Sequence, residues 1–348
     1  MKRKLLLAFT SAIVSLSLMS QDVHFSNAAY SPLNLNPGLA GANYAAQAVV
    51  NYRTQWNSVG APFQTIGAAA DMRVTENGRN KNGFLALGVN FYNDRAGQVR
   101  ISTNSASLNA AYHLKLDDNS TIGLGMYTGF GQRSLDAVGG LWGSQYDESM
   151  QAHNPALASG EVFENPNFSY FDVGSGVVYT YGVNEKNMRS NDGFNVTAGY
   201  SVFHINRPSF SFTGNGEDPL YMRHAAFAAS SFGIKNKTMS IDPAIFFQMQ
   251  GPANLFLIGA DYRVYFKEAS RVTGNIKSAS FAFGAFLRAR DAFIARFIYS
   301  YADFSLGMSY DFNVSRLTPV SNGRGGMEFF FHWKLDQKMK QSGSRARI

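Results

Sequence analysis

Six histidines are the side chains of this chain best suited to acid–base catalysis or to metal binding. They are His24, His113, His153, His204, His224 and His332. His153 follows Asp147, Glu148 and Ser149 in a polar stretch, a grouping that a hydrolase could use. A general base needs a rigid scaffold, which a long polar stretch does not provide, so we interpret these residues as a solvated loop.

A second grouping places His204 and His224 on either side of Glu217 and Asp218. Zinc accepts such ligands, but two histidines at adjacent strand ends more often face water. The chain has no cysteine, which excludes disulfides, zinc–thiolate sites, a cysteine nucleophile and a lipoprotein anchor. The sequence therefore predicts a protein without catalytic residues, bound metal or cofactor.

Glycines alternate with large residues in Gly123-Leu124-Gly125 and in Gly129-Phe130-Gly131. These fragments resemble parts of a phosphate-binding loop, but they do not open a helix. Alternation within a strand instead places the glycines on one face, where another backbone approaches closely. His113 and His332 also lie within strand-like segments, which predicts positions in a lumen or an interface.

Composition indicates what kind of scaffold holds these side chains. Lys and Arg number 31 and Asp and Glu number 24, but several basic residues belong to the two ends of the chain, so its body is close to neutral. A nucleic-acid groove needs clustered basic residues, which this distribution does not provide. Aromatic residues make up 14% and charged residues only 16%, against a usual 25% or so, with 33 glycines. This combination is typical of a membrane β-barrel.

The first twenty residues have the pattern of a signal peptide. Three basic residues precede an apolar run over 5–18, and cleavage is expected after one of two small residues, Ser17 near the end of that run or Ser20 beyond it. The run is shorter than the 20 or so residues that span a bilayer, and no later run of 18 apolar residues occurs. We therefore expect an exported chain without transmembrane helices.

Strict alternation of apolar and small or polar residues fixes the predicted fold. In 304–313, for example, Phe304, Leu306 and Met308 share one face, and Ser305 and Ser309 share the other. Segments of ten or more residues suit tilted membrane strands better than strands of a soluble sandwich. The sequence predicts an all-β fold, a transmembrane antiparallel β-barrel of about 14 strands with a short non-strand N-terminal segment. The predicted strands are 46–59, 63–74, 83–94, 101–116, 121–133, 169–181, 194–204, 221–235, 238–250, 254–266, 280–288, 292–301, 304–312 and 326–335.

Two checks support this strand assignment. Of the 10 prolines, Pro243 alone falls within a predicted strand, so we expect that strand to start at Ala244 or to carry a bulge. The two longest connections, 134–168 and 205–220, both follow odd-numbered strands. If both chain ends lie on the periplasmic side, these long loops are extracellular, as is usual for outer-membrane barrels.

The most specific motifs lie near the two ends of the chain. Residues 21–26 read Gln-Asp-Val-His-Phe-Ser, residues 35–38 read Leu-Asn-Pro-Gly, and residues 51–56 read Asn-Tyr-Arg-Thr-Gln-Trp. These motifs, with 310–317 and 326–329, resemble the PorP/SprF family of outer-membrane proteins associated with type IX secretion and gliding motility. Gly38 replaces the usual alanine of that family, which is a small-for-small change.

The resemblance implies a non-enzymatic protein of the outer membrane that supports the secretion or surface attachment of a large adhesin. Its implied partners are the C-terminal domain of the adhesin, other type IX secretion or gliding components, and outer-membrane lipid, but no nucleic acid. The residues expected to contact a partner or to line the lumen are Gln21, Asp22, His24, Phe25, Ser26, Asn34, Asn36, Pro37, Gly41, Asn51, Arg53, Gln55 and Trp56.

The expected organisation is a signal peptide over 1–20, an N-terminal segment over 21–45, the barrel over 46–335 and a basic tail over 336–348. The N-terminal segment could plug the lumen or lie against a periplasmic partner. Arg53 must face the lumen because arginine is costly in lipid, whereas Tyr52 and Trp56 suit an aromatic girdle on the opposite face. Two other functions remain possible for the whole protein, a small-solute porin and a barrel hydrolase. For the motif residues, the alternative to contacting a partner is that they only pack the lumen of the barrel.

Overall fold

The computed structural model describes residues 22–58, 60–75, 82–97, 99–136, 140, 142–161, 163–183, 193–212, 218–235, 237–267, 278–315 and 318–335. The predicted signal peptide, Gln21 and the basic tail lie outside these residues. No helix in the described ranges is long and apolar enough to cross a membrane.

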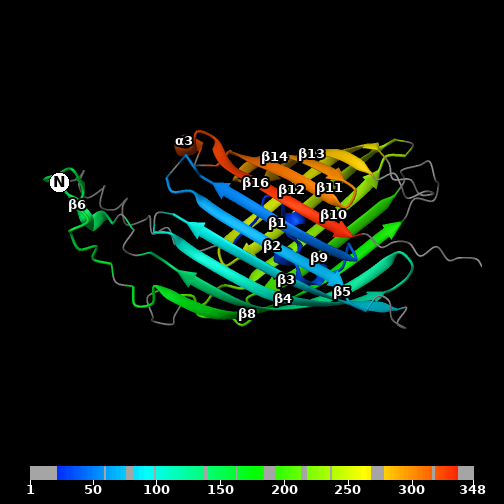
Figure 1. The fold of residues 1–348 in the computed structure, drawn as a ribbon, viewed down its shortest axis with the longest axis horizontal. Helices are drawn as coiled ribbons and strands as arrows, with labels where there is room; N and C mark the ends of the chain where they lie inside the picture. The colour runs from blue at the N-terminus through cyan, green and yellow to red at the C-terminus, as the bar shows by residue number, and fades with distance from the viewer. Residues whose placement is uncertain are drawn as a thin grey trace, which may run out of the picture.

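Within the described residues, fourteen antiparallel strands close into one barrel, in which the first strand pairs with the last (Figure 1). The strands follow one another around the wall in chain order, so the predicted fold class is confirmed. They are β1 (Ala46–Gln55), β2 (Phe63–Arg73), β3 (Gly83–Ala96), β4 (Ile101–Lys115), β5 (Ser120–Ser134), β8 (Asn167–Val183), β9 (Phe194–Phe203), β10 (Arg223–Gly233), β11 (Met239–Gln250), β12 (Ala253–Lys267), β13 (Ala279–Arg288), β14 (Ala292–Tyr301), β15 (Phe304–Asn313) and β16 (Arg324–Leu335).

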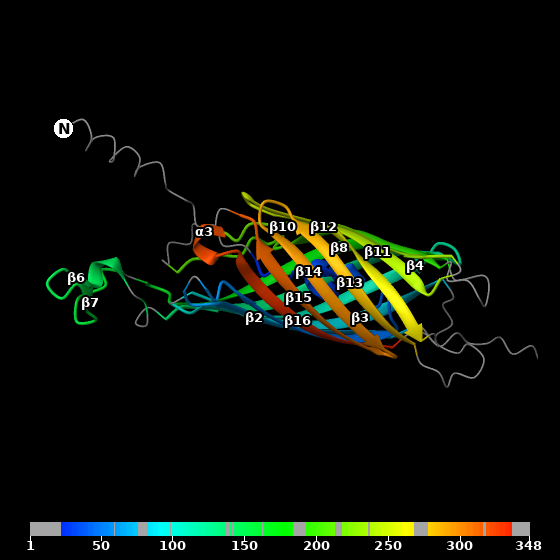
Figure 2. The same cartoon turned by 90° about the horizontal axis from the view of Figure 1, so that it is seen from above.

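The remaining elements are short. They are η1 (Ala28–Tyr30), α2 (Pro32–Leu35), η2 (Pro37–Leu39), η3 (Gly143–Gln145), β6 (Tyr146–Asp147), β7 (Ala152–His153) and α3 (Thr318–Ser321). The β6–β7 hairpin projects beyond one end of the barrel, the end that also carries α3 (Figures 1 and 2). We call this end the outer mouth and the opposite end, where β1 begins and β16 ends, the inner mouth. Long loops on the outer mouth match the extracellular side of outer-membrane barrels.

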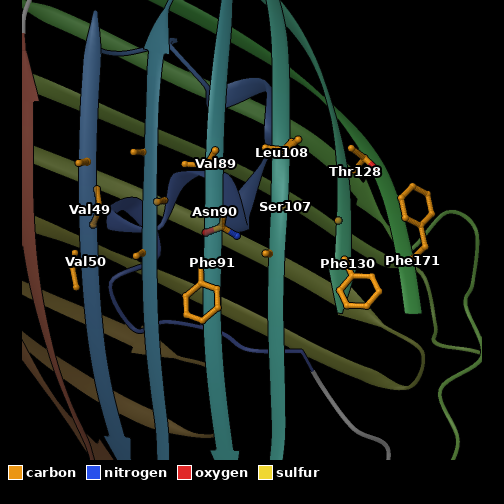
Figure 3. Close-up of a pocket in the computed structure, with 16 residues that line it drawn as sticks. Val49, Val50, Val89, Asn90, Phe91, Ser107, Leu108, Thr128, Phe130 and Phe171 are labelled. Atoms are coloured by element: carbon orange, nitrogen blue, oxygen red, sulfur yellow. The ribbon is translucent and has the colours of Figure 1, made fainter. Parts of the chain in front are cut away.

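The two faces of the wall follow the alternation of the sequence. In β15, Phe304, Leu306 and Met308 are exposed on the outer surface, whereas Ser305 and Ser309 are buried on the lumen side. An apolar outer surface is what a bilayer requires of a barrel wall. Figure 3 shows the same arrangement in β1–β5, with the N-terminal segment behind the strands.

The expectation for Pro243 was wrong in both of its forms. Strand β11 begins at Met239, four residues before Pro243, and its register with β12 runs unshifted past Pro243↔Ala260. The ladder with β10 instead omits the pairs at Pro243 and Asp242, because proline has no N–H to donate. A side-chain bond offsets part of this loss, since the Ser231 hydroxyl donates to Asp242 Oδ1 at 2.6 Å.

Candidate functional site

Residues 22–45, which we call the plug, lie inside the barrel along the inner faces of its strands. Helices α2 and η2 contact β3, β4, β5 and β8. The Asn36 side chain caps η2 by accepting from Gly38 N at 2.7 Å, and its amide donates to the carbonyls of Val177 and Tyr200, both at 3.1 Å. The plug thus has a defined conformation that is bonded to the wall.

Glycines in the wall make room for the plug. A Cβ at Gly125 would lie 2.5 Å from Gly38 Cα, a contact between two backbones that no side-chain rotation relieves. A Cβ at Gly176 would lie 2.8 Å from Asn36 Cγ, and one at Gly67 would lie 2.9 Å from the Phe25 ring. The predicted close backbone approach is confirmed at Gly125, whereas Gly123 and Gly131 make room for the rings of His113 and Tyr170.

A buried ionic network fixes the outer part of the plug. The Ser26 and Asn27 backbone N–H groups donate to the two carboxylate oxygens of Glu328, at 2.7 and 3.1 Å. The Ser26 hydroxyl donates to Asp311 Oδ2 at 2.8 Å. These bonds join residues about 300 positions apart in the chain, so they tie the plug to the last two strands.

Two arginines neutralise the carboxylates of this network. Arg53 and Arg288 lie 3.1 and 2.6 Å from Asp311 Oδ2, and Arg53 also donates to the carbonyl of His24. Arg53 is only 2% exposed and faces the lumen, as the cost of arginine in lipid requires. Since breaking a buried pair leaves an uncompensated charge at a cost of about 3–5 kcal/mol, the network resists the loss of any one member.

The first described residue of the plug is held by a histidine just beyond β9. His204 Nε2 lies 2.5 Å from Asp22 Oδ2, and His204 Nδ1 lies 2.7 Å from Asp172 Oδ2. Burial works to lower the pKa of His204, but the two carboxylates outweigh it and raise that pKa to about 9. Burial likewise opposes ionisation of Asp22, but His204 and Arg223 hold its pKa well below the usual range. An ion pair therefore holds this end of the plug at neutral pH.

A cavity of about 320 Å³ opens at the outer mouth between the plug and the wall of β12–β16, and we call it the outer cavity. His24, Gln55 and Trp56 line it, facing Arg288 and Asp291. Burial and the nearby arginines hold the pKa of His24 well below its usual range, so the imidazole is neutral. The outer cavity thus offers an indole, an amide, a neutral imidazole and charged groups to a ligand from outside.

The structure places the predicted site residues in two sets. His24, Gln55 and Trp56 line the outer cavity, and Asp22, Ser26 and Arg53 lie in the networks beside it. Phe25, Asn34, Asn36, Pro37, Gly41 and Asn51 lie deeper, within the plug or on the wall that it covers. Tyr52 faces outward as expected, but Trp56 lies past the end of β1 with φ 56° and joins the cavity lining.

Apart from Arg53, the sequence did not single out the wall residues that hold the plug. They include Asp172, Arg223, Arg288, Asp311 and Glu328. A signal was present, because Asp311 and Glu328 occupy lumen-facing positions of predicted strands, and a buried carboxylate needs a partner. The alternation shows which side chains face the lumen, but it does not show which of them contact the plug.

The expectation that His204 faces water was wrong, because its ring is buried between Asp22 and Asp172. The other histidines of the two groupings have partners nearby. His153 lies in the β6–β7 hairpin with its ring 3.1 Å from Gln145 Oε1, and Asp147 accepts bonds from Ser149. His224 Nδ1 lies 2.7 Å from the Tyr200 hydroxyl. Glu217 lies outside the described residues, and no group of three or more metal-ligating side chains occurs within them.

His113 and His332 both face the lumen. His113 Nε2 lies 2.7 Å from the carbonyl of Ala40 in the plug, and His332 Nε2 lies 3.1 Å from Gln47 Oε1. Both rings are buried, which matches the predicted lumen positions.

A second hollow, of about 630 Å³, lies on the outer surface of β1–β5 and β8 (Figure 3). Alanines form its floor, and Phe91, Phe130 and Phe171 stand around it as exposed side chains. Its surface is apolar and belongs to the face that a barrel turns toward lipid.

Comparison with known protein families decides the identity of the barrel. The family model for the type IX secretion system membrane protein PorP/SprF matches residues 17–332. The chain belongs to the PorP/SprF family. It is therefore a type IX secretion membrane protein with an outer-membrane barrel fold, as the resemblance of the motifs implied. No curated protein sequence matches the chain.

Solved structures share only the barrel architecture with this PorP/SprF chain. A mutant TodX monoaromatic hydrocarbon channel is 10% identical, with a TM-score of 0.46 over 90% of this chain and 95% of its own. A Pseudomonas aeruginosa FadL homologue is 11% identical, with a TM-score of 0.41 over 88% of this chain and 95% of its own. An outer-membrane channel from Pseudomonas putida F1 is 13% identical, with a TM-score of 0.36 over 90% of this chain and 99% of its own.

Proposed function

We propose that this barrel attaches a large surface adhesin to the outer membrane during type IX secretion by binding the C-terminal domain of the adhesin at the outer mouth. The observation that carries the proposal is the outer cavity, which family-motif residues line from two sides: His24 from the plug, and on the wall Gln55 at the end of β1 and Trp56 just beyond it. A partly exposed indole beside fixed polar groups is a frequent anchor of protein interfaces.

The plug favours attachment over passage through the lumen. It is bonded to the wall at its outer end by the Glu328 and Asp311 network and in its middle by Asn36. The charged partners are buried, so removing the plug would expose several of them at once. A polypeptide crossing this barrel would first have to break these bonds, whereas a domain bound at the outer mouth leaves them intact.

The proposal is tested by capture of the purified adhesin C-terminal domain on the detergent-solubilised, full-length barrel. Trp56→Ala removes the largest side chain of the outer cavity, and we expect captured domain to fall at least tenfold. Trp142→Ala is the matched control, because Trp142 packs on Phe163 in the outer loop, away from the cavity. Equal capture by the unaltered barrel and the Trp56→Ala variant would overturn the assignment of the outer cavity.

The rival function, a small-solute channel, makes a different prediction in planar bilayers. A seated plug predicts that the barrel conducts little more than background until the plug is disturbed. Stable large conductance of the unaltered barrel, together with failure to bind the adhesin domain, would favour the channel.

A further inference from the structure

The inner mouth carries a cavity of its own, of about 430 Å³, between the plug and strands β8–β11. We call it the inner pocket. It lies at the opposite end of the lumen from the outer cavity, because Thr180 is near the end of β8 and Thr197 near the start of β9. The two cavities therefore face different compartments.

The floor of the inner pocket is apolar and firmly packed. Leu35 and Leu39 of the plug meet Phe227 and Phe246 of the wall there. All four side chains are less than 10% exposed and belong to one buried cluster. A ligand therefore meets a preformed apolar surface that the plug and the wall build together.

The rim of the inner pocket is polar but carries no charged side chain among its lining residues. Hydroxyl groups come from Thr180, Thr197 and Ser230, and amide groups from Asn43 and Asn195. Such groups both donate and accept hydrogen bonds, as the backbone of a peptide does. A volume within the usual 300–1,000 Å³ range of ligand sites holds a few residues and excludes a folded domain.

We propose that the inner pocket binds an extended, uncharged peptide segment of a partner protein on the periplasmic side, with one large apolar side chain on the floor. The hydroxyl and amide rim would bind the backbone, and Phe227 and Phe246 would contact the inserted side chain. The inference rests on the proposed function in one respect, that the ligands of this barrel are proteins. The basic tail of the chain, residues 336–348, is a poor match because every lining residue of the pocket is uncharged.

The test uses the purified, full-length barrel and fluorescent peptides in a polarisation titration. The probe is the C-amidated peptide Gly-Ser-Phe-Ser-Gly with fluorescein on its N-terminus, compared with the same labelled peptide carrying Ala or Lys in place of Phe. Burying a phenylalanine side chain predicts binding about 10- to 100-fold tighter for the Phe peptide. Equal binding of the Phe and Ala peptides, or no binding of either, overturns the proposal.

Two neighbouring alanines of β10 supply matched variants. Ala229 lines the inner pocket, so Ala229→Phe fills it and should reduce affinity for the Phe peptide at least tenfold. Ala228 alternates with it on the strand and faces outward, so Ala228→Phe should leave affinity within twofold. If Ala229→Phe fails to fold, Ala42→Phe fills the pocket from the plug side and gives the same expected loss.

Two competitors distinguish other occupants of the pocket. If a peptide of residues 336–348 displaces the Phe peptide at lower concentration, the pocket is the site of the chain's own tail. If toluene binds the pocket and the Phe peptide does not, the pocket is a solute site. Either result overturns the proposal. Ala229→Phe should also leave capture of the adhesin domain unchanged, so failure at the inner pocket is distinguishable from failure at the outer cavity.

Discussion

Gly125→Ala is the sharpest test of how the plug is seated. The added Cβ would lie 2.5 Å from Gly38 Cα, so either the plug backbone or β5 must shift. Forcing one methyl group into a packed interior typically costs about 1–3 kcal/mol. Strand β5 pairs along its whole length with β4 and β8, so we expect the plug to yield. The equilibrium constant for local opening of the plug should then increase about 5- to 150-fold.

The assay uses the absence of cysteine from the chain. Leu33 is 2% exposed in α2, so the thiol of Leu33→Cys reacts with a maleimide only when the plug opens. We expect the labelling rate in detergent-solubilised barrel to rise by the factor above when Gly125→Ala is added. The control is Gly182→Ala in β8, whose Cβ would have its nearest neighbour at 3.9 Å and should leave the rate within twofold. An unchanged rate in a folded Gly125→Ala barrel would refute the close contact.

Three further predictions concern the wall. The pKa of His204 rises from 6.5 to about 9 on folding, which adds about 3 kcal/mol to the free energy of unfolding. This stabilisation is complete below pH 6.5 and is lost as the pH rises through 9. The urea midpoint of the unaltered barrel should therefore decrease as the pH is raised from 7 to 10, and the midpoint of His204→Gln should decrease less. Equal decreases of the two midpoints would contradict the ion pair. Glu328→Gln should destabilise the barrel by about 1.5–3 kcal/mol in urea unfolding, because it weakens charge-assisted bonds from Ser26 and Asn27, and an unchanged midpoint would count against that network. Pro243→Ala should restore a ladder bond to β10 and raise stability by about 0.5–1.5 kcal/mol, whereas a lower midpoint would show that the ladder gap has another cause.

The wall of this barrel was largely predictable because a membrane strand has a simple two-residue period. Nearly every predicted strand matches the structure to within three residues at each end, and 292–301 coincides with β14. The largest difference is at β1, which ends at Gln55 instead of residue 59 because Trp56 adopts a positive φ. Alternation determines which face a side chain takes, but it does not mark where a strand gives way to a turn.

The interior could be predicted only in part. Alternation placed Arg53 in the lumen, and the glycine pattern marked the close approach at Gly125. The partners of Ser26 lie 285 and 302 residues away, at Asp311 and Glu328, and no local pattern links positions so far apart. Proximity across the lumen depends on how many strands separate two positions and on their stagger, which a single sequence does not determine.

The pairing of β1 with β16 has a consequence for the order of assembly. Ala46 lies opposite Leu335, so the wall is complete only when the last strand has been delivered. The plug precedes β1 in the chain, yet it forms bonds with β15 and β16 as well as with β8 and β9. Contacts of such long sequence separation carry a large loop-closure entropy and make folding slow. The plug therefore cannot complete its bonds until β15 and β16, the last two strands of the chain, have joined the wall.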